Sequence, residues 1–371
     1  MTTLEDDNST CLQRKPDDEA LLKLLNNAFD GWGSREYFEW KYDQFPNYDP
    51  SEHNFIVTTA TGKLIGARRV FERRLQRPDG ETALAHVHGG TAVHEDHRGK
   101  GHYSDLLRRS NEYSRQKADC LFTFNRSGKI TTEHHEKNGW NYIILPVFVK
   151  PLSPLKVASN YVFDNLALQS IAGKLSSAGR HLTKSEIVSR WIAVSAGRIY
   201  GRNRQTVSTA RTPSTDYVID VVEDPSEELI EQLDTVLTDM TNETYKFERS
   251  KKAIRHSLLF PSARLILARK KDQRTIAGFA VAGHLNRSGL VETRVLEQAW
   301  DDPAVTQRLL TRVESDAREF GADVVVACSE HQPSKNWIEM GTEYMMWPPG
   351  FSTHEYPASQ GDWRITTRDI L

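Results

Sequence analysis

The chain has 371 residues and a mass of 42.3 kDa, a length that suggests two domains rather than one. Its 48 Lys and Arg residues nearly balance its 50 Asp and Glu residues, so the basic surface of a general nucleic-acid-binding protein is not expected. No apolar run approaches the roughly 20 residues needed to cross a bilayer, and the acidic, polar first residues are unlike a signal peptide. Three distant cysteines favour neither a disulfide framework nor structural zinc. We therefore expect a cytoplasmic protein without membrane contact.

Hydrophobic patterning predicts a mixed α/β unit in the first 150 residues. The elements expected in chain order are a helix at Asp17–Phe29, strands at Phe55–Thr59, Leu64–Leu75 and Thr82–Val93, a helix around Tyr103–Tyr113, a strand at Cys120–Asn125, a helix at Ile130–Asn138 and a strand at Trp140–Val149. Pro78–Gly80 indicates a hairpin turn, and Gly89-Gly90 indicates a β-bulge.

The rest of the chain divides into a connector and a second domain that echoes the first. A long helical stretch is expected at Leu155–Tyr200. The strand CLFTF after Ala118-Asp119, with the helix HHEKNGW behind it, corresponds to VVVACSE after Ala322-Asp323, with a predicted helix NWIEMGT behind it. This repetition predicts two copies of one fold. The predicted division is a tail at 1–14, an N-terminal domain at 15–150, a helical connector at 151–214 and a C-terminal domain at 215–371.

The loop from Arg98 to Ser104 is the segment best suited to chemistry. It connects a predicted strand to an amphipathic helix, whose first N–H groups have no intrahelical partner and whose dipole is positive there. Gly99 and Gly101 let the backbone approach an anion closely, and Lys100 adds positive charge. The spacing fits neither a Walker loop nor a dinucleotide-binding fingerprint. From the residues alone, a phosphate site and an ordinary strand–helix turn both remain open.

The span AVHEDHRGKGHYSDLL resembles the acyl-CoA-binding motif of the GNAT N-acetyltransferases, whose pattern is Gln/Arg-x-x-Gly-x-Gly/Ala. Arg98 and Gly101 fill the first and fourth places, and Tyr103 departs from the sixth. Downstream, His135 stands where the family usually has the Tyr of Tyr-x-x-x-Gly-Phe, four residues before Gly139. The resemblance is good over the N-terminal domain and weak over the C-terminal domain. It implies two GNAT-like α/β domains in tandem, each built on a mixed sheet.

For the cofactor, the resemblance implies acetyl-CoA or another short acyl-CoA as co-substrate, and no metal. The pantetheine arm would pair with backbone groups where two strands separate, and the loop would hold the pyrophosphate. The residues implied in cofactor binding are Ala92, Val93, Arg98, Gly99, Lys100, Gly101, His102, Tyr103 and Ser104. The corresponding segment of the second copy, EQAWDDPAV, has no glycine and carries Asp301-Asp302, which would repel phosphates. The C-terminal domain is therefore expected to close the acceptor cleft.

For catalysis, the resemblance implies direct attack of a primary amine on the thioester, which requires a base for the amine and a donor for the thiolate. His135 is the candidate donor, with Tyr142 as an alternative, and Glu95 and His88 are candidates near the base position. Two of these have a structural alternative, namely a helix surface residue for His135 and a solvated loop residue for Glu95. Cys120 is expected in the core rather than as a nucleophile.

Two further groups are ambiguous from sequence. Tyr37, Trp40 and Tyr42 are more typical of core or domain-interface packing than of a wall for the acceptor. Arg68-Arg69 and Arg73-Arg74 could contact an anionic acceptor, but a solvated sheet face is favoured.

The sequence thus predicts an enzyme that transfers an acetyl or short acyl group from acyl-CoA to the primary amine of a small-molecule acceptor. Two alternatives stay open: a Fem-type aminoacyl or peptidyl transferase that uses charged tRNA, and a non-catalytic acyl-CoA-binding module. The sequence indicates neither the acceptor nor the oligomeric state. It also leaves open whether the carboxylate of Leu371 reaches the active site.

Overall fold

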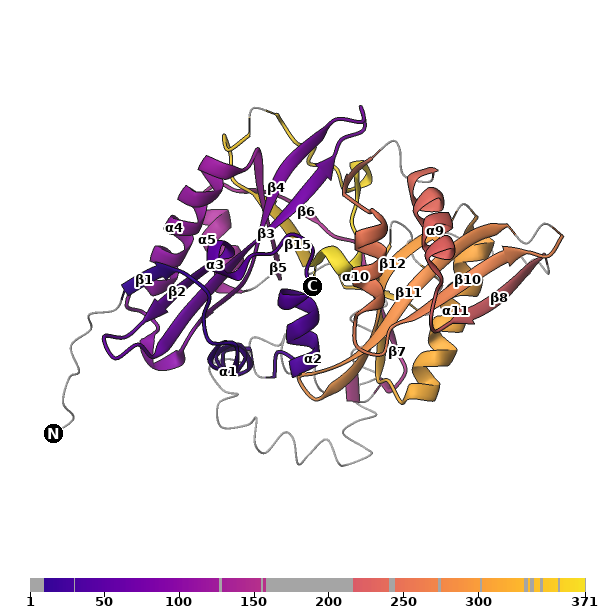
Figure 1. Ribbon diagram of the computed structural model, residues 1–371, viewed down its shortest axis with the longest axis horizontal. Helices are drawn as coiled ribbons and strands as arrows, with labels where there is room; N and C mark the ends of the chain where they lie inside the picture. Colours follow the sequence, from indigo (N-terminus) through magenta and orange to yellow (C-terminus); the bar gives the residue numbers. More distant parts are fainter. Residues whose placement is uncertain are drawn as a thin grey trace.

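The computed structural model describes residues 10–29, 31–126, 129–154, 156–157, 216–239, 244–272, 275–300, 302–329, 333, 337–340, 343–352 and 354–370. Leu371 and nearly all of the helix predicted at 155–200 and of the predicted connector lie outside these residues. Within them two β-sheets lie next to each other, one coloured mainly indigo to magenta and the other mainly orange (Figure 1). None of the described helices is both long and apolar enough to span a membrane.

The first sheet has the strand order β1-β2-β3-β4-β5-β15-β6, with β9 beside β3 and β16 beside β9. Its strands are β1 Thr10–Gln13, β2 Asn54–Thr58, β3 Leu64–Gln76, β4 Thr82–Val93, β5 Cys120–Arg126, β6 Asn141–Ile144, β9 Tyr245–Phe247, β15 Glu343–Trp347 and β16 Trp363–Arg364. The pattern of apolar residues predicted β2 to β5 to within two residues at each end.

The second sheet has the order β14-β7-β13-β12-β11-β10-β8. Its strands are β7 Val147–Pro151, β8 Tyr217–Val222, β10 Arg264–Lys270, β11 Ile276–Arg287, β12 Leu290–Trp300, β13 Val324–Cys328 and β14 Ile338–Glu339. The described helices are α1 Asp18–Ala28, α2 Arg35–Phe38, the π-helix η1 Glu39–Asp43, α3 Pro50–His53, the 3₁₀ turn η2 Glu95–His97, α4 His102–Lys117, α5 Ile130–Lys137, α9 Glu227–Asp239, α10 Lys251–Leu258, α11 Pro303–Phe320, the 3₁₀ turn η4 Gln360–Asp362 and α12 Thr367–Ile370. The prediction of a mixed α/β fold is confirmed.

The two sheets exchange strands, which the sequence did not indicate. Strand β7 follows β6 in the chain but pairs with β13 and β14 of the second sheet, with Val149 opposite Val326. Strand β15 comes from the C-terminal part of the chain but lies between β5 and β6, with Met345 opposite Phe124. Each sheet, with the helices packed on it, is called here a unit. Figure 1 shows β15 inside the first unit and β7 inside the second. Each sheet is therefore completed by the other half of the chain.

Two predicted elements are corrected by this exchange. The single strand predicted at Trp140–Val149 is two strands, β6 and β7, in different sheets. The helix predicted at 336–342 is also wrong where the structure describes it, because Ile338–Glu339 forms β14 and pairs with β7. In both cases the pairing partner is remote in sequence, so local periodicity could not show it.

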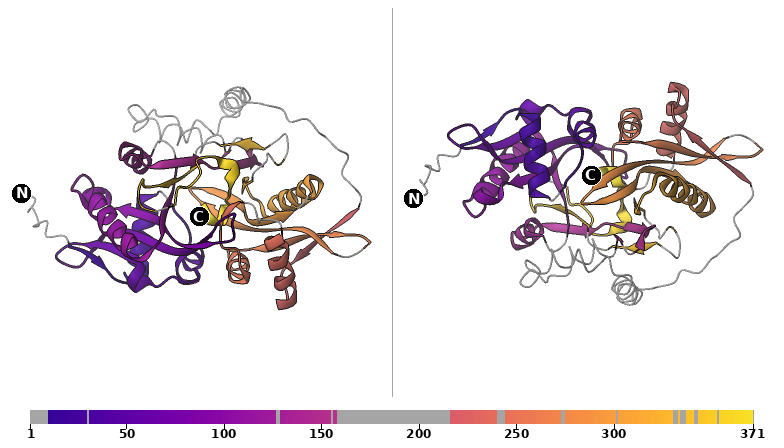
Figure 2. Two further views of the ribbon diagram at one scale, coloured as in Figure 1. Left: turned by 90° about the horizontal axis from the view of Figure 1, so that it is seen from above. Right: turned by 90° about the horizontal axis from the view of Figure 1, so that it is seen from below.

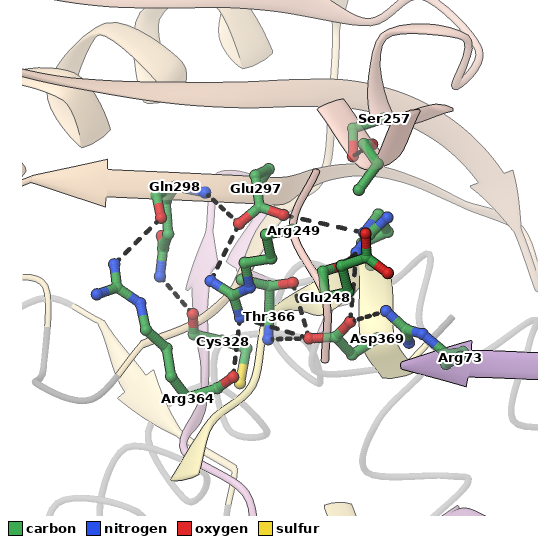
Figure 3. A network of polar contacts seen from close by, with 12 residues as sticks. Arg73, Glu248, Arg249, Ser257, Glu297, Gln298, Cys328, Arg364, Thr366 and Asp369 are labelled. Atoms are coloured by element: carbon green, nitrogen blue, oxygen red, sulfur yellow. Dashed lines mark hydrogen bonds and ion pairs between the residues drawn. The ribbon is translucent and has the colours of Figure 1, made fainter. Parts of the chain in front are cut away.

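A buried ionic network connects the two sheets through α12 (Figure 3). The carboxylate of Asp369 pairs with Arg73 of β3, and its other oxygen lies 3.5 Å from Arg249. The same Arg249 lies 3.2 Å from Glu297 of β12. All four side chains are at least nine-tenths buried. Figure 2 places α12, coloured yellow, between the two sheets. The network therefore fixes β3 relative to β12.

The ionisation of Asp369 is set by its surroundings. Burial acts to raise the pKa of this carboxyl, but the guanidinium groups of Arg73, Arg249 and Arg368 outweigh it and lower the pKa from the ordinary 3.8 to about 2. Because folding lowers this pKa, the carboxylate stabilises the fold at pH values above about 4. The contribution is lost as the pH falls from about 4 towards 2.

Replacement of Asp369 by Asn should lower the free energy of unfolding at pH 7 by about 3–5 kcal/mol, since breaking a buried pair leaves charged partners uncompensated. Urea unfolding measures this difference, which should shrink as the pH is lowered from 4.5 to 3. Asp362→Asn, at an exposed aspartate of η4, is the control and should change stability by less than about 0.5 kcal/mol. Equal stabilities of D369N and wild type would show that the network does not hold the sheets together.

Candidate active site

A cavity of about 1330 Å³ lies between the two units and is called here the central cavity. From the first unit it is lined by β4 and β5, through residues such as His88 and Thr123. From the second unit it is lined by the β11–β12 hairpin, including Arg287, and by α12, including Asp369. A ligand in this cavity would contact both halves of the chain.

The parallel strands β4 and β5 separate at one wall of the central cavity. Their pairing covers only Ala85–His88 against Cys120–Thr123, although both strands continue further. Beyond that point β4 pairs only with β3, and β5 pairs with β15. The predicted separation of these strands is confirmed, and it leaves one edge of β4 open.

A β-bulge at Gly90 accompanies the separation. The register advances by three residues on β4, from Gly89 to Ala92, but by two on β3. Gly90 has φ +58°, and a Cβ atom there would lie 2.7 Å from Nη1 of Arg69 and 2.8 Å from Oη of Tyr42. The bulge predicted at Gly89-Gly90 is therefore confirmed, and both conformation and space require glycine at position 90.

The backbone of β4 offers Val93 rather than Ala92 to a ligand at the open edge. The N–H of His94 donates to the carbonyl of Ile65 at 2.8 Å, so His94 and, two residues back, Ala92 direct their backbone groups toward β3. Val93 directs its groups to the open edge, where its carbonyl accepts a hydrogen bond from Nε of Arg98 at 3.2 Å. The predicted pairing of Ala92 with the pantetheine arm is thus corrected, and the N–H of Val93 has no acceptor in the described part of the chain.

The loop before α4 leaves backbone donors without partners. Gly101 is the N-cap residue of α4, with φ +86°, and supplies no capping side chain. The N–H groups of His102, Tyr103 and Ser104 have no hydrogen-bond acceptor among the described residues. This helix end is suited to an anion by four features. These are the left-handed glycine, the absent side-chain cap, the free N–H groups and the helix dipole.

The corresponding helix end in the second unit is closed by its own side chain. A carboxylate oxygen of Asp302 accepts a hydrogen bond from the N–H of Ala304 at 2.8 Å, and Pro303 occupies the first turn of α11. This carboxylate occupies the position that a phosphate would take, and its negative charge would repel one. The contrast supports the prediction that the second copy holds no pyrophosphate.

A buried cation, Arg68, lies beside the separated strands and lines the central cavity. It is 2% exposed, and it donates hydrogen bonds to Ser110 (2.9 Å), Thr91 (2.5 Å) and Nδ1 of His88 (2.8 Å). None of these partners is an anion, and no described carboxylate forms an ion pair with it. Burial lowers the pKa of Arg68 to about 10, so the group remains charged at neutral pH.

The hydrogen bonds of Arg68 determine the proton positions behind it. Because a guanidinium only donates, Nδ1 of His88 accepts, and Nε2–H of His88 donates to Ser114 at 2.7 Å. The Ser114 hydroxyl then donates to Nδ1 of His86 at 2.8 Å, and Nε2 of His86 faces Glu72 at 3.6 Å. Both nitrogens of His88 are occupied, and burial, followed by Arg68, holds its pKa well below the usual range. This geometry favours a role for His88 in positioning Arg68 over its predicted role as a base.

His135 lies in the wall of the central cavity but stays neutral. It is 1% exposed, its ring centroid is 4.0 Å from that of Trp140, and Nδ1 has no partner among the described residues. Burial, then Arg68 and His134, lower its pKa to about 3. His135 is therefore buried rather than on the helix surface, and it carries no additional proton for the thiolate at neutral pH. A neutral imidazole keeps one N–H and can donate a hydrogen bond to a thiolate.

The other predicted groups differ in their position. Glu95 lies in η2, is exposed and lines the central cavity, so it is a carboxylate at the cavity mouth. Tyr142 is 44% exposed on β6 and is absent from the described residues that line the cavity, which removes it as the alternative donor. Cys120 is in the core, and burial raises the pKa of its thiol to about 12, so the predicted core role is confirmed.

The aromatic residues after α1 pack between the units, as predicted. Tyr37, Trp40 and Tyr42 are each at most 2% exposed. The indole N–H of Trp40 donates to the carbonyl of His256 at 2.7 Å, and Nε2 of His256 lies 2.8 Å from the carbonyl of Trp40. This reciprocal contact attaches η1 to α10 of the second unit.

The arginine pairs of β3 are where sequence reasoning failed. Arg68, Arg69 and Arg73 are buried, and only Arg74 is exposed, so the favoured solvated face is wrong for three of the four. Neighbouring residues of a strand point to opposite faces, so burial of both Arg68 and Arg69 requires a sheet covered on both sides. The length of β3, together with its apolar and small residues, was the sequence signal for a central strand.

Comparisons with known proteins give a domain family and a fold. Residues 13–141 match the family model described as an acetyltransferase (GNAT) domain. Two structures of Saccharomyces cerevisiae N-myristoyltransferase, one with bound myristoyl-CoA and one with myristoyl-CoA and inhibitors, are 13% and 12% identical. They cover 92% of this chain in both cases and 78% and 80% of those chains, with TM-scores of 0.58 and 0.59. A GCN5-related N-acetyltransferase from Kribbella flavida is 13% identical over 91% of this chain and 71% of that chain, with a TM-score of 0.49. No curated protein matches the sequence significantly.

Residues 13–141 therefore form a GNAT acetyltransferase domain. The resemblance found in the loop before α4 is confirmed, and the N-myristoyltransferase structures show that the fold extends over both units.

The neutral state of His135 can be measured directly. In a ¹H–¹³C spectrum of the imidazole groups, the signal that disappears in His135→Gln should not titrate between pH 5 and 8, because burial disfavours the imidazolium. A midpoint between pH 6 and 7 for this signal would contradict the assignment and restore His135 as a proton donor.

Proposed function

We propose that the protein transfers an acetyl or other short acyl group from acyl-CoA to the primary amine of a small-molecule acceptor bound in the central cavity. The observation that carries the proposal is that the open edge of β4 leads, through the loop after it, to the unpartnered N–H groups at the start of α4, with Thr91 and Tyr103 of these two elements lining the central cavity. In this proposal the pyrophosphate binds the N–H groups of His102 to Ser104, with Arg98 and Lys100 nearby. The pantetheine arm pairs with Val93 as an added strand would.

The chemistry follows from the groups at the strand separation. The neutral amine attacks the thioester carbonyl carbon, the new C–N bond forms, and the C–S bond breaks to release the thiolate of CoA. Arg68 uses three of its five N–H groups in the contacts described, and the charge it presents to the cavity stabilises the oxygen of the tetrahedral intermediate. His135 donates a hydrogen bond to the thiolate. Glu95 at the cavity mouth takes up the proton that the amine loses.

The donor is the least restricted part of the proposal. The N-myristoyltransferase structures of similar fold contain myristoyl-CoA. A long acyl chain is therefore the second candidate donor, and both chain lengths belong in the binding experiment.

Isothermal titration with acetyl-CoA and with myristoyl-CoA tests the cofactor site. Gly101→Glu places a carboxylate where phosphate must approach and should weaken binding at least tenfold. Gly80→Glu is the matched control, because Gly80 has a similar φ of +87° and equally open surroundings but lies in the turn before β4, at its opposite end. The control should bind as wild type does.

Equal affinity of G101E and wild type would show that the loop is not the cofactor site. Failure of millimolar acetyl-CoA and of myristoyl-CoA to bind wild type would instead favour the tRNA-dependent alternative. Binding without thiol release across a panel of amines and peptide amino termini would favour the non-catalytic module.

The role of Arg68 predicts a loss of rate rather than of affinity. Arg68→Met should lower kcat for thiol release about 100-fold, the size typical of removing one oxyanion donor, with the Kd for acetyl-CoA changed less than threefold. Arg74→Met, on the same strand but exposed, should leave kcat unchanged. A normal kcat in a folded R68M protein would exclude Arg68 from the reaction.

A further inference from the structure

The central cavity has more positive than negative side chains in its lining. Among the described residues, ten Lys and Arg side chains line it, against five Asp and Glu side chains. Five of the ten have a carboxylate within 4.0 Å, and these are Arg73, Arg126, Lys156, Arg294 and Arg368. The remaining five therefore determine which charge a ligand should carry.

Two of the remaining five cations, Arg68 and Arg98, belong to the site already described, and a third, Lys129, is exposed at the start of α5. Arg98 is also exposed and is in the loop before α4. Arg68 is held by three neutral acceptors at the strand separation. Lys41 and Arg287 are then left, and no part of the acyl-transfer step uses them.

Lys41 lies on η1 between the buried residues Trp40 and Tyr42. Its amino group has neither a hydrogen bond nor an ion pair with any described residue. The charges that act on it are those of Arg287, Arg69 and Arg294, all positive, and burial together with these charges holds the pKa of Lys41 well below its usual range. Lys41 is half-buried, and a cation partly removed from water next to other cations is unfavourable unless an anion joins it.

Arg287 lines the same cavity from the second unit, and its charge acts more strongly on Lys41 than that of Arg69 or Arg294. It is the last residue of β11, directly before the turn Ser288-Gly289, whose φ values of +51° and +77° are those of a tight hairpin turn with both central residues left-handed. The N–H of Ser288 donates to the carbonyl of Gly31 at 3.1 Å, so the hairpin tip is attached to the first unit. Like Lys41, Arg287 has no ion pair with a described residue.

We propose that Lys41 and Arg287 bind an anionic group, a carboxylate or a phosphate, carried by the acceptor amine. This inference rests on the proposed acyl transfer and adds the substrate class: an amine with a negatively charged group. Each unit supplies one of the two cations, Lys41 from η1 and Arg287 from the β11–β12 hairpin. The acceptor site is therefore complete only when the hairpin lies against η1. The anion also explains why the cavity keeps two cations beyond those that the cofactor needs.

Matched pairs of amines test the proposal by turnover. The pairs are 4-aminobutyrate against butylamine and phosphoethanolamine against ethanolamine, each differing in the anionic group. Wild type should acylate at least one anionic member with a kcat/KM at least tenfold above that of its neutral partner, and the pair that shows it distinguishes carboxylate from phosphate. Lys41→Met and Arg287→Met should each remove the preference, with turnover of the neutral amine and the Kd for acetyl-CoA unchanged. Lys63→Met, at an exposed lysine outside the cavity, should keep the preference.

Direct binding separates this inference from the proposed function. With CoA saturating the cofactor site, 4-aminobutyrate or phosphoethanolamine should bind wild type and should bind K41M and R287M at least tenfold more weakly. If these anionic amines bind in this way but are never acylated, the acceptor site stands and the proposed reaction fails. If neutral and anionic amines are acylated equally, or if neither anionic amine binds, or if both variants bind as wild type does, the anion site is overturned. Acylation of Lys41 itself, found by mass spectrometry, would also overturn it.

Discussion

The central cavity depends on the buried pairing of Asp369 with Arg73 and Arg249. Charged groups removed from water are tolerated only with a partner of opposite charge, so each of these side chains restricts the position of the others. Arg73 belongs to β3 of the first sheet, and Arg249 reaches Glu297 on β12 of the second. Since Arg73 and Asp369 also line the cavity, one network both joins the sheets and forms a wall of the site. The exchange of β7 and β15 acts in the same direction, because neither sheet is complete without the other half of the chain.

The two units have different roles although they share a mixed-sheet plan. In the first, glycine at position 101 leaves the start of α4 uncapped and able to bind an anion. In the second, Asp302 caps α11 and removes that property. The second unit contributes instead through its β11–β12 hairpin, whose tip at Ser288 is attached to Gly31 and brings Arg287 into the cavity. An acyl donor and an acceptor can thus be held from opposite sides.

The features predicted from sequence are those that depend on nearby residues. The loop around Gly101 and the strand at Thr82–Val93 follow from local backbone preference and alternation, and both are correct. The division of Trp140–Val149 between two sheets was not predictable, because β7 pairs with strands more than 170 residues later. Arg68 was missed for a related reason: its partners come from two other elements, β4 and α4, and its burial depends on α4 covering β3. The neutral state of His135 likewise depends on burial that a helical pattern does not reveal.

Hydrogen exchange measured by mass spectrometry, with and without saturating acetyl-CoA, tests the central claim most directly, because the two units serve as controls for each other. The account predicts slower amide exchange at the start of α4, over His102–Ser104, and at the open edge of β4 around Val93. It predicts no change at the start of α11, over Ala304–Thr306. Protection at α11, or equal exchange in both states at α4, would contradict a cofactor site in the first unit.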